Sequence, residues 1–254
     1  MPFRRARPWA PLAALLSLAA CAPRDPALGR HVDHPDFLEE VAWAFLGDQV
    51  AFGPRYAGTK PHDRTLAWLH DELQFRADTL VAQRFTFERG AGKRVEMTNL
   101  LARWRPAEPR RILLVAHWDT RPKADESADP ADRRLPVPGA NDGAAGTAVL
   151  LTLAELFRQQ KPEVGVDLLF TDGDDFVDGR FPGTEHFLAA MPKTYRPAFA
   201  LVLDQVGDRD PWFPRDAGSR RHGAMAVRRV WGTATEMGLD SVFVAEAVAD
   251  SAGA

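Results

Sequence analysis

The sequence has a single cysteine and almost no net charge, and these two shortages exclude several kinds of protein. Its 32 basic and 35 acidic residues sum to a net charge of −3 at pH 7. Such a chain has no excess of positive charge to neutralise phosphates, so nucleic acid is not an expected partner. One cysteine in 254 residues excludes an internal disulfide framework and a zinc site built from several thiolates. Any metal site must therefore use histidine and carboxylate ligands.

Motifs of several common enzyme classes are also missing. No G-x-S-x-G sequence is present, which argues against the nucleophile elbow of an α/β-hydrolase. Neither a G-x-x-x-x-G-K-[ST] loop nor a G-x-G-x-x-G fingerprint occurs. The hydrophobic fraction of 45% and the charged fraction of 26% are typical of a globular domain.

The N-terminal segment has the features of an export signal. Three arginines, Arg4, Arg5 and Arg7, precede an uncharged, mostly apolar run from Pro8 to Ala20. This run is shorter than the roughly 20 residues that a membrane-spanning helix needs. It ends in Leu18-Ala19-Ala20-Cys21, which resembles a bacterial lipobox, the signal at which a cysteine is acylated.

We therefore predict a lipoprotein signal peptide over residues 1–20, a lipid on Cys21 and a polar tether over residues 21–33. Ala22 follows the cysteine, which by resemblance to lipoprotein sorting in Gram-negative bacteria favours the outer membrane. We expect an exported protein that is anchored to the periplasmic face of that membrane. An ordinary cleaved secretory signal is the alternative.

Residues 34–254 are predicted to form one α/β domain, because helical and strand-like segments alternate along them. The expected architecture has three layers, αβα, around a central mixed and mostly parallel sheet, with early strands as antiparallel edges. We predict helices from about His34, over 61–77, 144–160, 184–191 and 224–237, and strands over 80–87, 98–104, 111–116, 164–170 and 198–203.

Metal-capable residues follow each buried strand. His117 and Asp119 follow one strand, Asp174 and Asp175 the next, and Asp204 the third, while Asp142 precedes a long helix. Any one of them alone is more typical of a turn or a helix cap. Because ligand sites in open α/β sheets lie beyond the carboxyl ends of the strands, we expect the whole set to converge.

One histidine with several carboxylates suits zinc, either one ion or two that share a carboxylate. The adjacent Asp174 and Asp175 indicate a division of labour in which one binds metal and the other moves a proton. Asp119 is predicted to orient the His117 ring without binding the metal itself. The long connection from Arg121 to Asp142 is interpreted as either a functional loop or a solvated surface loop.

The ordered motifs resemble metallopeptidase family 28, which contains zinc aminopeptidases and glutaminyl-peptide cyclotransferases (glutaminyl cyclases). The residues of the motifs His117–Pro122 and Ala140–Gly143 are most similar to those of bacterial members of the glutaminyl cyclase branch. The resemblance covers about Phe37 to Met237. The motifs are Gly53–Thr59, Gln83–Phe85, Ala116–Pro122, Gly139–Gly143, Asp172–Asp175, Gly183–Phe187 and Asp204–Gly207.

The resemblance implies a zinc enzyme that acts on peptide or protein N-termini. His117, Asp142, Asp175 and Asp204 match the metal positions of the two-zinc aminopeptidases, with Asp142 as the bridging carboxylate. In the one-zinc cyclases, Asp142 and Asp175 would hold the zinc, whereas His117 and Asp204 would not, and Asp204 would help to position the substrate's N-terminal end. Asp174 matches the general acid/base, which in a cyclase takes a proton from the α-amine as it attacks the γ-amide carbonyl and ammonia leaves.

The chain departs from the family pattern in two ways. The acid/base is usually Glu, one methylene longer than Asp174. The family's last zinc ligand is a His in a C-terminal segment, so the resemblance implies a domain incomplete at Ala254. His222, expected in a polar loop, and His186, expected at a helix start, are not predicted to replace it. The interpretations are therefore a glutaminyl cyclase-like enzyme, a zinc aminopeptidase, or an inactive or truncated lipid-anchored binding protein.

Overall fold

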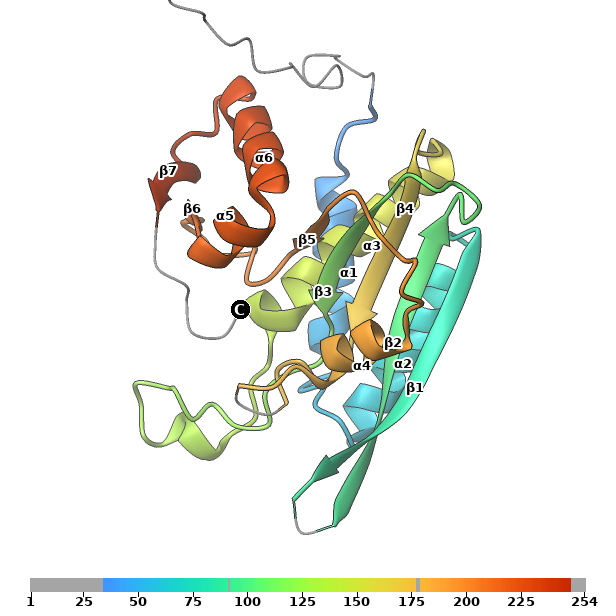
Figure 1. The fold of residues 1–254 in the computed structure, drawn as a ribbon. Helices are drawn as coiled ribbons and strands as arrows, with labels where there is room; N and C mark the ends of the chain where they lie inside the picture. The colour runs from blue at the N-terminus through green and yellow to red at the C-terminus, as the bar shows by residue number, and fades with distance from the viewer. Residues whose placement is uncertain (1–33, 91, 177–178, 248–254) are drawn as a thin grey trace, which may run out of the picture. The chain divides into compact units, whose positions relative to one another are not determined.

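The computed structural model describes residues 34–90, 92–176 and 179–247 (Figure 1). The predicted signal peptide, the lipid site at Cys21 and the tether over residues 21–33 lie outside the described residues. Among the residues that are described, no helix combines the length and apolar character needed to cross a membrane.

The centre of the fold is a five-stranded sheet in the order β1-β2-β4-β3-β5. β2 is antiparallel to both of its neighbours, β1 and β4, whereas β3 is parallel to both of its neighbours, β4 and β5. The predicted mixed, mostly parallel sheet is thus confirmed, because β1, β4, β3 and β5 run in one direction and β2 runs against them. The strands are β1 (Thr79–Arg89), β2 (Lys93–Trp104), β3 (Arg111–His117), β4 (Gly165–Thr171) and β5 (Ala200–Val202).

The connections explain these directions. Only three residues separate β1 from β2, and so short a connection can only produce an antiparallel pair. The segment between β3 and β4 instead contains α3 (Gly146–Gln159), a crossover helix that returns the chain parallel to its first direction.

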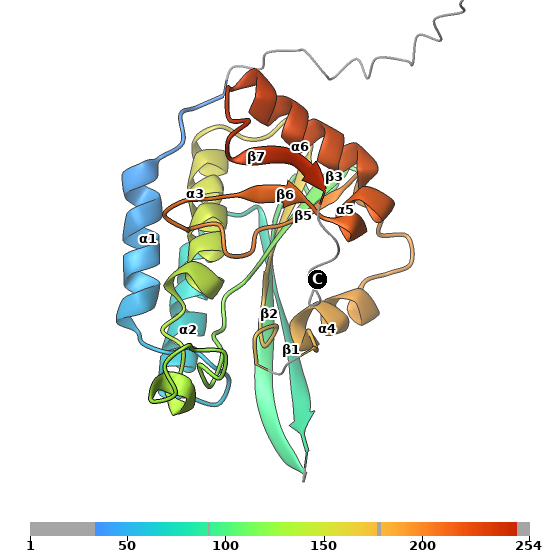
Figure 2. The ribbon, with the colours of Figure 1, turned by 90° about the vertical axis from the view of Figure 1, so that its left-hand side faces the viewer.

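Helices cover both faces of the sheet, which confirms the three layers. Figure 2 shows α1 (Glu39–Ala51), α2 (Lys60–Gln74) and α3 on one face and α4 (Pro182–Ala190) on the other. Neighbouring residues of β2 contribute to different hydrophobic cores, because successive side chains of a strand point to opposite faces of the sheet. Leu100 belongs to the large core under α1 to α3, and Leu101 to the smaller core that contains Phe187 of α4.

Local sequence explains where the helices form. The Thr59 hydroxyl accepts a hydrogen bond from the His62 amide at 3.3 Å and so caps the start of α2, where Pro61 occupies the first turn. Leu69 and Leu73 of the same helix are completely buried against the sheet. The helices expected around these positions are confirmed.

The last part of the described chain contains two helices and a second, two-stranded parallel sheet, of which the sequence predicted only α6. Trp231 of α6 packs against the Phe243 ring at 5.7 Å and donates its indole N–H to the Val244 carbonyl at 2.8 Å. His222, expected in a loop, instead ends the short helix α5, which Asp216 caps through the Ser219 amide at 2.7 Å. These elements are β6 (Phe213–Arg215), α5 (Ala217–His222), α6 (Ala224–Glu236) and β7 (Phe243–Ala247).

Candidate metal centre and active site

Three parallel strands end at the same edge of the sheet and bring the candidate residues together. His117, the last residue of β3, is paired with Thr171, the last residue of β4. Val115 of β3 is paired with Val202, the last residue of β5. The residues that follow these strands therefore share one edge, and the irregular turn η2 (Ala140–Ala145) carries Asp142 to it at the start of α3.

His117, Asp142 and Asp204 form a cluster of possible metal ligands. The Nε2 atom of His117 lies 2.9 Å from Oδ1 of Asp142 and 3.5 Å from Oδ1 of Asp204. The three ligand atoms all lie within 4.8 Å of one another. Imidazole nitrogen and carboxylate oxygen are ligands that zinc accepts, so the donor set fits this ion.

The backbone around Asp142 allows this close approach. Asp142 is extended, and the next residue, Gly143, has φ +94°, a conformation that glycine adopts without strain. A Cβ atom on Gly143 would lie 2.5 Å from the Asp119 carbonyl and 3.3 Å from Cε1 of His117. Glycine is therefore needed for the turn to pack against the Asp119 carbonyl.

Gln205 is a site residue that the sequence analysis did not single out. Its side-chain N–H donates to Oδ2 of Asp142 at 3.0 Å. Its φ of +47° places a non-glycine residue in the left-handed region directly after Asp204. Strained backbone of this kind is concentrated at functional sites, and it has no signature in the sequence.

The cluster attracts positive charge. Burial lowers the pKa of His117, but its contacts with Asp119, Asp142 and Asp204 outweigh this effect, and the pKa lies well above 6.5. Burial likewise raises the pKa of Asp142, but the hydrogen bond with His117 outweighs it, so the net direction is downward. A metal ion that binds here must displace the imidazole proton, because only the neutral ring is a ligand.

Asp119 and Asp175 lie next to the cluster. Asp119 is completely buried, with Oδ1 at 3.4 Å from Nδ1 of His117 and Oδ2 accepting the Asp175 amide at 3.2 Å. The Asp175 carboxylate pairs with Nε of Arg121 at 3.0 Å. Burial and the charge of Asp142 raise the pKa of Asp175 to about 6, against the opposing effect of Arg121.

Asp174, the candidate general acid/base, contacts the start of α4. Its Oδ1 accepts the Thr184 amide at 3.0 Å, and its Oδ2 accepts the Thr184 hydroxyl at 2.6 Å. In this arrangement both carboxylate oxygens have partners on α4. His186, on the same helix, stacks on the ring of Phe85 at 4.4 Å, in keeping with a structural role.

A hollow of about 220 Å³ lies beside Asp142 and Asp175. Most of its other lining comes from the long loop, through Arg121, Ala124, Glu126, Ser127 and Val137, and Gln205 completes it. The loop is tied by a hydrogen bond from the Ala124 amide to the Leu135 carbonyl at 2.7 Å. It therefore forms a wall of the site, and part of it, Asp132–Arg134, is a short helix, η1.

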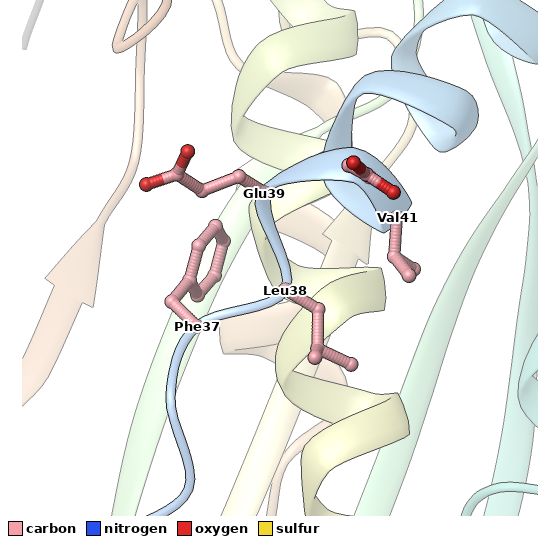
Figure 3. A pocket seen from close by; sticks show the side chains of 5 residues that line it. Phe37, Leu38, Glu39 and Val41 are labelled. Atoms are coloured by element: carbon pink, nitrogen blue, oxygen red, sulfur yellow. The ribbon is translucent and has the colours of Figure 1, made fainter.

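A second hollow, of about 320 Å³, lies at the start of α1 (Figure 3). It is lined by Phe37, Leu38, Glu39, Glu40 and Val41, all from one short segment. None of the converging residues borders it, so the hollow beside Asp142 and Asp175 is the candidate active site.

Two buried residues that the sequence analysis passed over lie behind the site. His62 contacts both oxygens of Asp172 at 3.0 Å and stacks on Trp118 at 4.6 Å. Arg55 is completely buried and donates to the carbonyl groups of Trp118 and Gly139. Nothing in the sequence marked His62, and Arg55 was marked only as a member of the motif Gly53–Thr59. The burial of a polar side chain cannot be predicted from a single sequence.

A mixed sheet with a histidine–carboxylate cluster at the ends of its parallel strands defines a metal-binding α/β protein. The model of peptidase family M28 matches residues 99–245, which is more than half of the chain. The chain belongs to this family, and the family prediction is confirmed.

Solved structures of related proteins have the same fold. The glutaminyl cyclase of Tannerella forsythia is 32% identical with a TM-score of 0.80, and the match covers 85% of this chain and 78% of that one. A Zn-dependent exopeptidase from Parabacteroides distasonis ATCC 8503 is 31% identical with a TM-score of 0.81, over the same shares. The predicted zinc-exopeptidase-like fold is thus confirmed.

Curated relatives match over shorter stretches. The alkaline phosphatase isozyme conversion protein of Escherichia coli (strain K12) is 34% identical over 106 residues, or 40% of this chain and 30% of that protein. The matched part spans less than a third of the length of each curated relative.

Proposed function

We propose that this chain is a zinc-dependent enzyme that converts an N-terminal glutamine of peptides or proteins to pyroglutamate, with release of ammonia. The observation that carries the proposal is the similarity to a bacterial glutaminyl cyclase at 32% identity over 78% of that enzyme. The hollow of about 220 Å³ beside Asp142 and Asp175 supports it.

The zinc ligands of either candidate enzyme are drawn from His117, Asp142, Asp175 and Asp204, and the donor chemistry of the cluster supports zinc. When bound, the ion would act as a Lewis acid that polarises the γ-amide carbonyl of the substrate. By the family resemblance, a cyclase would use Asp142 and Asp175 for one ion, and a two-zinc peptidase would use all four residues. Asp119 lies 3.4 Å from the His117 ring and accepts the Asp175 amide at 3.2 Å, a placement that suits a group that orients metal ligands.

Asp174 is the proposed acceptor of the proton from the attacking α-amine. Burial raises the pKa of its carboxyl group, which suits a group that takes up a proton. This role requires at least one carboxylate oxygen to leave Thr184, to which both are bound.

A zinc aminopeptidase is the second candidate, and one observation favours it. The three residues that gather most closely, His117, Asp142 and Asp204, belong to the set that the resemblance assigns to two-zinc peptidases. The similarity to a Zn-dependent exopeptidase at 31% identity supports the same alternative.

Two assays on the full chain separate the candidates. A Gln-peptide cyclisation assay beside a Leu-anilide hydrolysis assay identifies the reaction, and metal analysis is expected to give about one zinc per chain for a cyclase and about two for a peptidase. Asp142→Ala should abolish zinc binding, whereas Asp132→Ala, in the same loop but outside the cluster, should leave it intact. A wild-type chain without zinc or activity would leave the inactive binding protein as the explanation.

We also propose that the mature protein begins at Cys21 and is anchored by a lipid in the cell envelope, on the periplasmic face of the outer membrane. The support is in the sequence: the only cysteine of the chain follows a basic start and a short apolar run.

A further inference from the structure

Arg55 has an unusual environment for a buried cation. Its side chain is completely buried. It donates to five main-chain carbonyl groups at 2.8 to 3.4 Å, those of Gln49, Gly53, Trp118, Pro138 and Gly139. Neutral carbonyls replace the hydration of the guanidinium only in part, so burial lowers the pKa of Arg55 to about 10 and Asp119 opposes this.

Three of these carbonyls, those of Trp118, Pro138 and Gly139, belong to the segments that carry the candidate ligands. Trp118 directly follows His117, and the Arg55 amide donates to the Thr120 hydroxyl at 2.8 Å. Gly139 begins the turn that carries Asp142. One planar, five-donor group thus joins the end of β3 to the turn before α3, which are otherwise far apart in the sequence.

Arg111 provides a comparison within the same sheet. It is also buried, but it forms a two-pronged pair with Asp167, from Nε at 2.7 Å and from the second terminal nitrogen at 2.8 Å. Arg111 begins β3 and His117 ends it, so the two lie about 20 Å apart at the usual rise of a strand. Arg111 therefore stabilises the fold without reaching the site.

We propose that Arg55 is a positioning residue of the metal centre: its contacts with the carbonyl groups of Trp118, Pro138 and Gly139 set the distance between His117 and Asp142. This inference rests on the proposed zinc site. Replacing a residue that positions metal ligands typically lowers metal affinity or activity 10- to 100-fold.

The test compares R55K with R111K in the full chain. Each variant keeps a positive charge but loses the planar fork. Three quantities are measured: stability by urea unfolding, main-chain amide hydrogen exchange of the zinc-free protein, and zinc affinity by calorimetry. For R55K we expect faster exchange at residues 118–120 and 139–145 and a zinc affinity about 10- to 100-fold lower. R111K should lose stability while exchange in these segments and zinc affinity stay at the wild-type level.

Equal zinc affinity and equal exchange in R55K and R111K would overturn the proposal and leave Arg55 a purely structural role. If the wild-type chain binds no zinc, the proposed function fails, while exchange in the zinc-free variants still decides whether Arg55 positions the two segments. Should R55K not fold, T120V removes only the hydroxyl that accepts the Arg55 amide. Faster exchange at 118–120 in T120V would support the proposal, and unchanged exchange would overturn it.

Discussion

Replacing Thr184 by valine tests whether the Asp174 carboxylate stabilises α4 or is turned toward the hollow beside Asp142 and Asp175. Valine has nearly the shape of threonine and keeps the main-chain N–H that donates to Oδ1 of Asp174 at 3.0 Å. Only the hydroxyl that donates to Oδ2 at 2.6 Å is removed. A hydrogen bond to a charged group contributes about 1.5–3 kcal/mol, so we expect the free energy of unfolding of T184V to fall by about this amount.

The measurement is urea unfolding of the zinc-free protein at pH 7, with T184S as the matched control. Serine retains the hydroxyl and should stay close to the wild type. A loss in T184V below about 0.5 kcal/mol, the range of ordinary surface substitutions, would refute the reasoning. It would mean that Asp174 does not hold α4 and is turned toward the hollow instead.

The same variant bears on proton transfer. Burial raises the pKa of Asp174, and the Thr184 hydrogen bonds lower it. Without the hydroxyl, the pKa should rise further, and one carboxylate oxygen becomes free to reach the substrate amine. We therefore expect T184V to keep or exceed the wild-type kcat in the cyclisation assay. A loss of kcat in T184V that T184S restores would instead make Thr184 the residue that orients Asp174 for transfer.

Three further predictions follow from the structure and the sequence. Gly139→Ala should cost about 2 kcal/mol or more, because its Cβ would lie 2.3 Å from Cγ2 of Thr120 in addition to φ +68°, whereas Gly238→Ala, with φ +72° and open space, carries only the backbone cost. Equal shifts in thermal unfolding would contradict this overlap. Burial lowers the pKa of His62, but the hydrogen bond with Asp172 outweighs it and raises the pKa above 6.5. The stabilisation from protonated His62 is thus complete below pH 6.5 and is lost as the pH rises through the raised value. The advantage of the wild type over H62Q/D172N in urea should therefore shrink as the pH rises above 6.5, and a constant difference would count against this. Cys21→Ala should move the protein from the membrane to the soluble fraction, and a variant that stays with the membrane would disprove the anchor.

The sequence predicted the elements whose periodicity or apolar run is strong. The runs that became β3 and β4 are buried on both faces, and the leucines of α2 repeat at helical spacing. It did not predict β6, β7 or α5. β6 has three residues and α5 has six, which is too short for either period to stand out from the surrounding sequence.

The site was predictable as far as strand ends allow. Because parallel strands end at one edge, the order of the motifs was enough to expect that His117, Asp142 and Asp204 converge, and they do. The partners of each group could not be predicted. Thr184 on Asp174 and Gln205 on Asp142 depend on side-chain rotation and on a left-handed backbone that residue type does not reveal.

The charges at the sheet edge connect these observations. Four carboxylates, those of Asp119, Asp142, Asp175 and Asp204, lie around one histidine, and like charges so close disfavour ionisation. Three cations offset them: His117, whose pKa is raised by its carboxylate contacts, Arg121, which pairs with Asp175 at 3.0 Å, and Arg55, whose charge acts on Asp119. An ion at His117, Asp142 and Asp204 has only to displace a proton, whereas an ion that also uses Asp175 has to displace the Arg121 guanidinium. Zinc titration of R121Q and the wild type therefore measures how much the Arg121–Asp175 pair weakens zinc binding. Tighter binding, or an additional zinc ion, in R121Q would identify Asp175 as a zinc ligand with which Arg121 competes.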